Sequence, residues 1–227
     1  MGSKNKLKRF KENECFPNVI QPIRNTLVTN SFDLKGRWRR NYFKNDNQIV
    51  LELGCGKGEY LIYLAKKYPN KNFIGIDIKG ARFWKGAKTA IEEKILNIVF
   101  IRSQIELITN IFASDEISEI WITFPDPQIK YKRTKHRIIN SDFLIKYKSI
   151  LIKHGLVHLK TDSEFLHGYL LGLLKNMPCQ INYANHDIYH SMNVPEEVTY
   201  IQTFYEKIFL KQNKPITYLQ YFWNDKG

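Results

Sequence analysis

Hydrophobic and polar positions alternate regularly along the chain from about residue 48 onward. Short runs rich in β-branched and aromatic residues, such as Gln48–Leu53 and Glu119–Phe124, predict buried strands. Apolar residues spaced three or four positions apart, as in Glu59–Tyr68, predict helices. Further strands are expected at Asn72–Asp77, Ile98–Ile101, Gly155–Leu159 and Ile216–Trp223, and further helices at Lys79–Lys94, Gln104–Phe112, Ser141–Lys153, Ser163–Lys175 and part of Pro195–Leu210. This alternation predicts an α/β fold with a central, mostly parallel sheet and helices on both faces.

The first 44 residues lack this periodicity. Pro17 and Pro22 interrupt them, and basic residues dominate. They are therefore predicted to form a basic, partly flexible N-terminal arm (residues 1–44) that precedes a single α/β domain (residues 45–227). Trp38 lies among three arginines and is a candidate RNA contact, with core packing as the alternative.

Positive charge is concentrated in two places. The formal net charge is +13; residues 1–44 carry eleven Lys or Arg against three acids, and residues 130–137 carry five against none. The rest of the chain is neutral, with 19 bases and 19 acids. A uniform preference for lysine would raise the charge everywhere, so the clustering favours a binding surface for a polyanion such as a nucleic acid.

Several classes of protein are disfavoured by what the sequence contains. No uncharged apolar run approaches the roughly 18 residues of a membrane helix, and no apolar core follows the basic start as in a secretory signal. The three cysteines are far apart, and the six histidines show no metal-binding spacing. We therefore expect a cytoplasmic protein without a membrane association, a disulfide framework or a metal site.

The turn after the first predicted strand reads ELGCGKG. Its glycines let the backbone approach a ligand closely, and Asp77, at the end of the second strand, is placed to accept hydrogen bonds from a ribose. Dinucleotide sites use the spacing G-x-G-x-x-G, whereas Gly54 begins a G-x-G-x-G sequence that follows Glu52. A carboxylate beside the turn would repel a pyrophosphate but would suit the cationic S-adenosylmethionine. This cofactor is the favoured interpretation; a turn without a ligand is the alternative.

The stretch ITFPDPQIKYKRTKHR follows the fourth predicted strand. Asp126 lies between two prolines that restrict the local backbone, and five cations follow it within eleven residues. A carboxylate at the ligand edge of the sheet, next to a phosphate-binding segment, is typical of an enzyme that modifies a nucleic-acid base. The alternative is an ordinary turn aspartate.

At this point the sequence resembles the tRNA (guanine-N7-)-methyltransferase family of class I, Rossmann-like methyltransferases. The matching segments are LELGCGKGEYL, NFIGIDIKGAR, ITFPDP with its basic continuation, HLKTD and TFYEKIFLKQNKPITYL, in family order from Leu51 to Leu219. The resemblance implies transfer of a methyl group from S-adenosylmethionine to N7 of a guanosine in the tRNA variable loop, with S-adenosylhomocysteine as the other product.

The resemblance also implies roles for individual residues. The implied catalytic residue is Asp126. The implied cofactor contacts are Glu52, Gly54, Asp77, Gln104 and Asp126, and the implied tRNA contacts are Lys130, Asp162, Thr203, Phe204, Tyr205 and Glu206. Two positions depart from the family: Gln104 replaces an aspartate, and Gln128 replaces a tryptophan.

Other functions remain open at this level. A class I methyltransferase for small molecules or proteins would not need the basic segment, and a non-catalytic RNA-binding module would not need Glu52 or Asp126. A nicotinamide oxidoreductase is a more distant alternative. The expected partner is tRNA, and the protein is expected to be a monomer or a homodimer.

Overall fold

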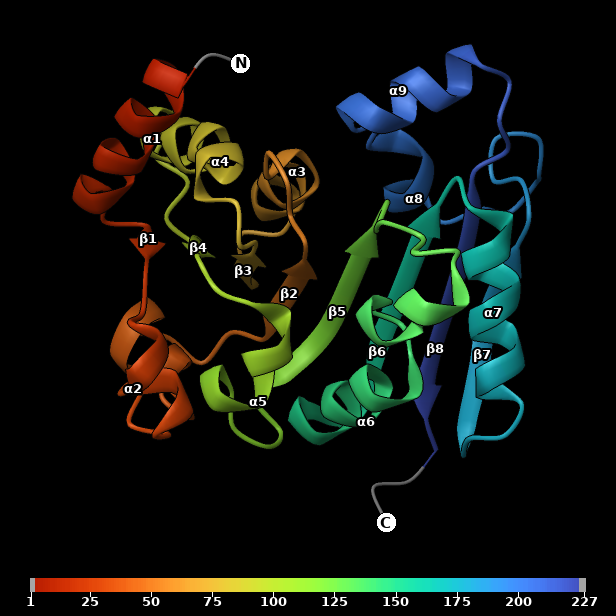
Figure 1. The fold of residues 1–227 in the computed structure, drawn as a ribbon, viewed down its shortest axis with the longest axis horizontal. Helices are drawn as coiled ribbons and strands as arrows, with labels where there is room; N and C mark the ends of the chain where they lie inside the picture. Colours follow the sequence, from red (N-terminus) through yellow and green to blue (C-terminus); the bar gives the residue numbers. More distant parts are fainter. Residues whose placement is uncertain (1–2, 225–227) are drawn as a thin grey trace. The chain divides into compact units, whose positions relative to one another are not determined.

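In the computed structural model, which describes residues 3–224, the chain forms two compact units that meet in sequence between Ala113 and Ser114. Figure 1 follows the elements from the N-terminus in red to the C-terminus in blue. The predicted border between residues 44 and 45 falls inside the first unit. Within the described residues, no helix is both long and apolar enough to cross a membrane.

The first unit contains four parallel strands in the order β1-β4-β3-β2. The strands are β1 (Val19–Ile20), β2 (Ile49–Leu53), β3 (Asn72–Ile76) and β4 (Ile98–Ile101). The helices are α1 (Ser3–Cys15), α2 (Arg24–Val28), the π-helix η1 (Trp38–Phe43), α3 (Glu59–Lys67), α4 (Gly80–Glu92), the 3-10 turn η2 (Ile105–Leu107) and α5 (Ile108–Ile111). Every residue of β2, β3 and β4 is buried, as expected for parallel strands covered by helices.

The second unit has strand order β5-β6-β8-β7, and only β5 and β6 are parallel to each other. Its strands are β5 (Ile117–Thr123), β6 (Leu151–Thr161), β7 (Cys179–Asn185) and β8 (Thr217–Trp223). Its helices are the 3-10 helix η3 (Tyr131–His136), α6 (Ser141–Ile150), α7 (Glu164–Leu174), α8 (Glu196–Tyr200) and α9 (Phe204–Lys211). Helix α7 packs against β6 and β8 (Figure 1).

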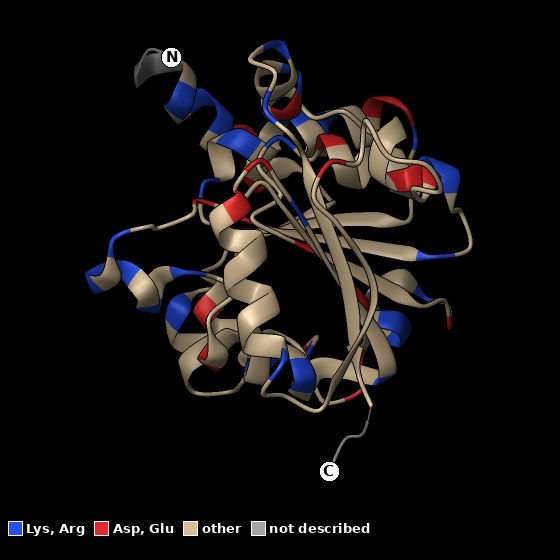
Figure 2. Cartoon of the chain, turned by 90° about the vertical axis from the view of Figure 1, so that its right-hand side faces the viewer, with Lys and Arg blue, Asp and Glu red and all other residues tan. Residues whose placement is uncertain are grey.

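The N-terminal segment is more ordered than its composition predicts. Helix α1 lies alongside α4 (Figure 1), where Asn13 donates a hydrogen bond to the carbonyl of Gly80 over 2.9 Å. The guanidinium of Arg9 stacks over the Trp84 ring at 4.6 Å. Figure 2 shows the Lys and Arg positions spread along the helix that begins at the N-terminus. The basic residues of α1 are thus carried on a helix that packs against α4.

Trp38 belongs to the core of the first unit. Its side chain is completely buried, its indole nitrogen donates to the Ile111 carbonyl over 3.1 Å, and its ring lies 5.8 Å from that of Phe112. The hypothesis that Trp38 contacts RNA is therefore wrong. Its arginine neighbours in η1 are exposed because a helix places adjacent residues on different faces.

Candidate functional site

The glycine turn and Asp77 form one hydrogen-bonded structure at the carboxyl ends of β2 and β3. Gly54, Gly56 and Gly58 all have positive φ angles, between 55° and 72°, which other residues rarely adopt. One carboxylate oxygen of Asp77 accepts from the Gly56 amide over 3.0 Å, and the other accepts from the Lys79 amide over 2.7 Å. Each oxygen keeps lone-pair capacity for another donor, such as a ribose hydroxyl.

Gly58 shows why this turn tolerates so little bulk. A Cβ atom there would lie 2.7 Å from Cε1 of Phe100, a residue of β4. The turn therefore sits tightly on the sheet, and α3 can begin directly after it. Gly54, Gly56 and Lys57 of the same turn stay exposed or half-exposed, so their backbone is accessible to a ligand.

Glu52 lies just before the glycine turn, and Cys55 lies within it. Both side chains are buried, and Glu52 is paired in register with Gly75 of β3. Burial, together with the charges of Glu52 and Asp77, raises the pKa of the Cys55 thiol well above its usual value. Cys55 is thus a protonated packing residue rather than a nucleophile.

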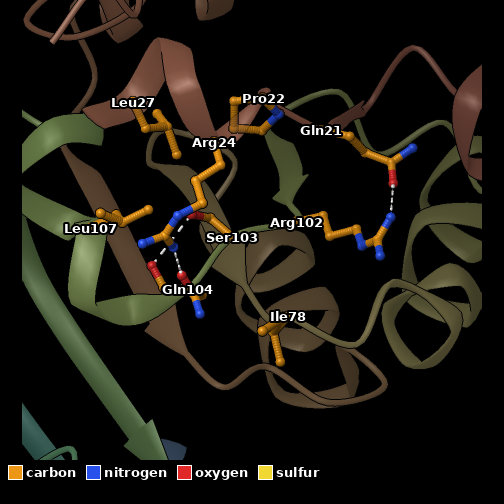
Figure 3. Close-up of a pocket in the computed structure, with 9 residues that line it drawn as sticks. All are labelled: Gln21, Pro22, Arg24, Leu27, Ile78, Arg102, Ser103, Gln104 and Leu107. Atoms are coloured by element: carbon orange, nitrogen blue, oxygen red, sulfur yellow. Dashed lines mark hydrogen bonds between the residues drawn. The ribbon is translucent and has the colours of Figure 1, made fainter. Parts of the chain in front are cut away.

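A pocket of about 310 Å³ opens beside Asp77, at the end of β4. It is lined by Gln21, Pro22, Arg24, Leu27, Ile78, Arg102, Ser103, Gln104 and Leu107 (Figure 3). The lining contains apolar side chains and a few polar groups, and the volume of the pocket is within the range of small-molecule sites. Gln104, a predicted cofactor contact, therefore lines a real cavity. The other lining residues were not predicted from the sequence.

In the second unit, Asp126 lies on an exposed turn just beyond β5. Its Oδ1 accepts a hydrogen bond from the Gln128 amide over 3.1 Å. Phe124 and Gln128 on either side have φ angles of 47° and 44°. Such left-handed conformations cost energy for residues other than glycine and are concentrated at functional sites. The turn thus holds an accessible carboxylate in a fixed place.

The basic segment after Asp126 has a structural arginine and four exposed cations. Arg137 is buried, donates to the carbonyls of Gln128 and Ile129 over 3.1 and 3.0 Å, and lies 4.8 Å from the rings of Phe165 and Tyr169. The prediction that Arg137 holds a phosphate is therefore wrong. The exposed cations are Lys130, Lys132, Arg133 and Lys135. Arg137 anchors the segment that presents them.

The predicted tRNA contacts Thr203 and Glu206 have partners within the second unit. They form a capping box at the start of α9, in which the Thr203 hydroxyl accepts from the Glu206 amide and the Glu206 carboxylate accepts from the Thr203 amide. Glu206 is completely buried, 2.6 Å from the ammonium of Lys160. Phe204 and Tyr205 stay half-exposed in an edge-to-face pair. Direct contact of any of the four with tRNA stays a prediction.

Lys160 is a buried cation that sequence reasoning missed. It lies on β6 and donates to the Ile201 carbonyl over 2.9 Å as well as to Glu206. Burial lowers the pKa of Lys160 to about 8, although the Glu206 charge opposes that change, and burial likewise raises the pKa of Glu206 against the influence of Lys160. A lysine within a strand-forming run gives no sequence signal of burial.

Asp162 follows β6, and Ser163, not Asp162, caps the next helix. The Asp162 carboxylate lies 3.6 Å from the ammonium of Lys214. This pair connects the end of β6 to the segment between α9 and β8. A tRNA contact by Asp162 stays a prediction.

Comparison with known proteins now defines the family. A methyltransferase family model, Methyltransf_4, matches residues 46–219. A tRNA (guanine-N(7)-)-methyltransferase of Christiangramia forsetii is 66% identical over 97% of this chain and 99% of its own length. The chain belongs to the tRNA (guanine-N7-)-methyltransferase family. A second family member, from Bacteroides fragilis, is 40% identical over 99% of this chain and 88% of its own length. The family resemblance seen in the sequence is confirmed.

Solved structures support the fold of this tRNA (guanine-N7-)-methyltransferase family member. A 16S rRNA (adenine(1408)-N(1))-methyltransferase from Catenulisporales acidiphilia, solved with its cosubstrate SAM, has a TM-score of 0.55 at 12% identity, covering 86% of this chain and 94% of the other. An antibiotic-related methyltransferase has a TM-score of 0.59 at 18% identity, covering 84% and 94%. The predicted α/β, Rossmann-like methyltransferase fold with a mostly parallel sheet is confirmed, and the protein is a methyltransferase.

Proposed function

We propose that this methyltransferase transfers the methyl group of S-adenosylmethionine to N7 of a guanosine in the variable loop of tRNA. The observation that carries the proposal is the near full-length identity of 66% to a relative with that name, together with the retained Glu52, Asp77 and Asp126. A methyltransferase for small molecules or proteins would have no use for four exposed cations beside Asp126.

The first unit has the groups that S-adenosylmethionine requires. The positive φ angles of the glycine turn expose backbone to the ligand, and Asp77 retains acceptor capacity for the ribose. The buried carboxylate of Glu52 complements a cationic amino or sulfonium group. Ile78, exposed directly after Asp77, offers an apolar face for a purine. When bound, this cosubstrate supplies a methyl group on a positively charged sulfur.

The second unit has the groups that guanosine methylation requires. N7 of guanine carries a free lone pair, so no protein base has to remove a proton before the transfer. The methylated base is a cation. The Asp126 carboxylate would stabilise the positive charge that develops on the base and could accept hydrogen bonds from its Watson–Crick edge. The remaining task is to position the base, which falls to Asp126 and the residues around it.

The exposed cations after Asp126 are expected to bind tRNA phosphates. Replacing Lys132 and Arg133 by glutamine should weaken tRNA binding and reduce the slope of log K against log salt concentration by roughly 0.7–0.9 for each lost phosphate contact. The measurement is a fluorescence binding titration at several salt concentrations.

A double glutamine variant at Lys153 and Lys175 is the matched control for this experiment. Both lysines are exposed; Lys153 lies at the start of β6 and Lys175 follows α7, away from the carboxyl ends of the strands. Their replacement removes the same charge but should leave the salt slope unchanged. Equal slopes for both double variants would show that the segment after Asp126 contributes only general charge.

A further inference from the structure

Residues of the N-terminal segment form one wall of the pocket beside Asp77. Strand β1 pairs in parallel with β4, with Val19 opposite Phe100 and Ile20 opposite Ile101. Because parallel strands end at the same edge, the residues that follow β1 lie beside those that follow β4. Arg102 fixes this arrangement, since its amide donates to the Ile20 carbonyl over 2.9 Å and its guanidinium donates to the Gln21 side chain over 3.3 Å (Figure 3).

The place of this pocket identifies the part of a nucleoside that it would accept. Asp77 directly follows β3 and is oriented by the glycine turn, and from this position a carboxylate can bind a ribose. Ile78, the next residue, already lines the pocket, which extends from there to the residues after β4. A base attached to that ribose would therefore enter between Ile78 and the N-terminal wall made by Pro22 and Leu27.

Arg24 determines how Gln104 faces this pocket. Its guanidinium donates a hydrogen bond to Oε1 of Gln104. Because arginine has only donors, the amide atom next to it must be the oxygen. The Gln104 amide nitrogen consequently lies on the side away from Arg24 (Figure 3) and presents its two hydrogens elsewhere.

We infer that Arg24 is a positioning residue for the purine subsite, because it orients Gln104 to donate to a ring nitrogen of the adenine in S-adenosylmethionine. This inference rests on the proposed function. The oriented amide offers a donor to the unprotonated ring nitrogens of adenine, which accept hydrogen bonds. An aspartate at this position could only accept, from the exocyclic amino group. Gln104, oriented by Arg24, thus binds adenine by donating a hydrogen bond, whereas an aspartate would bind it by accepting one.

The test is the affinity for S-adenosylhomocysteine, measured by isothermal titration calorimetry on the full chain. Arg24→Met should raise Kd about tenfold, since it removes a hydrogen bond from a charged donor. Arg24→Lys, which keeps a donor, should recover most of that loss. Gln104→Ala should raise Kd about as much as Arg24→Met does. The double variant should have a Kd no higher than that of the weaker-binding single variant, because both changes remove the same interaction. In turnover assays, KM for S-adenosylmethionine should rise while kcat stays within about twofold.

Arg40→Met is the charge-matched control. Arg40 is exposed on η1 and is not among the pocket-lining residues, so its loss should leave Kd within about twofold. Wild-type affinity in Arg24→Met, or additive losses in the double variant, would overturn the inference while leaving the proposed function intact. Absence of binding by the wild-type chain would instead overturn the cofactor assignment and this inference with it.

Discussion

The Asp126→Asn variant is expected to methylate tRNA about a hundredfold more slowly than the wild type, the scale seen when one preorganised electrostatic contact to a transition state is removed. Asparagine keeps the shape of the side chain and an oxygen to accept from the Gln128 amide. The substitution therefore removes the negative charge while leaving the turn in place. The loss should fall on kcat, because the charge matters most when the base becomes cationic.

Single-turnover methylation and S-adenosylhomocysteine binding, measured side by side, separate these effects. Binding should change by less than about threefold, so that the loss is confined to the transfer step. Asp142→Asn is the control, since Asp142 is an exposed carboxylate in the first turn of α6. Unchanged turnover in Asp126→Asn would remove Asp126 from the chemistry.

The Lys160→Met variant is expected to lose about 3–5 kcal/mol of stability, because it leaves the buried Glu206 carboxylate without its compensating cation. The loss should be visible as a lower midpoint in urea unfolding followed by circular dichroism. Because Glu206 also completes the capping box of α9, we expect the first turn of α9, with Phe204 and Tyr205, to be less well ordered in the same variant. Weaker tRNA binding should therefore accompany the loss of stability.

Two further variants identify the origin of that loss. Replacing both partners, as Lys160→Met with Glu206→Gln, should restore most of the stability, since no uncompensated charge remains buried. Lys214→Met removes the lysine of a more exposed pair with Asp162 and should cost less than about 1 kcal/mol. A double variant as unstable as Lys160→Met would show that packing around the lysine stem, rather than its charge, stabilises α9.

The strands of the parallel part of the fold could be predicted from the sequence because burial on both faces leaves a continuous apolar run. Strands β2 to β5 were found in this way, each within a few residues of its observed bounds. Strand β7 was missed because its residues are mostly exposed or half-exposed, which leaves no apolar pattern to detect. Helix α1 was missed because lysine-rich composition hides the few contacts, such as that of Asn13, that hold it on α4.

A similar physical reason separates the residues of the candidate site that could be predicted from the sequence from those that could not. The proposed site residues that follow strands, such as Asp77 and Asp126, could be predicted from the sequence because turn residues and apolar runs mark their positions. Residues whose position depends on a partner far away in the sequence could not be predicted. Arg24 reaches Gln104 across 80 positions, and Lys160 pairs with Glu206 across 46, and only the folded chain brings these partners together.

The most direct test of the proposed function is methylation of unmodified tRNA with labelled S-adenosylmethionine, followed by cleavage at N7-methylguanosine and mapping of the cleaved position. We predict that the label appears on N7 of one guanosine in the variable loop, and that Asp126→Asn reduces that same signal. Label on another atom or another base, or no label on tRNA while a protein or small molecule is methylated, would contradict the proposed function.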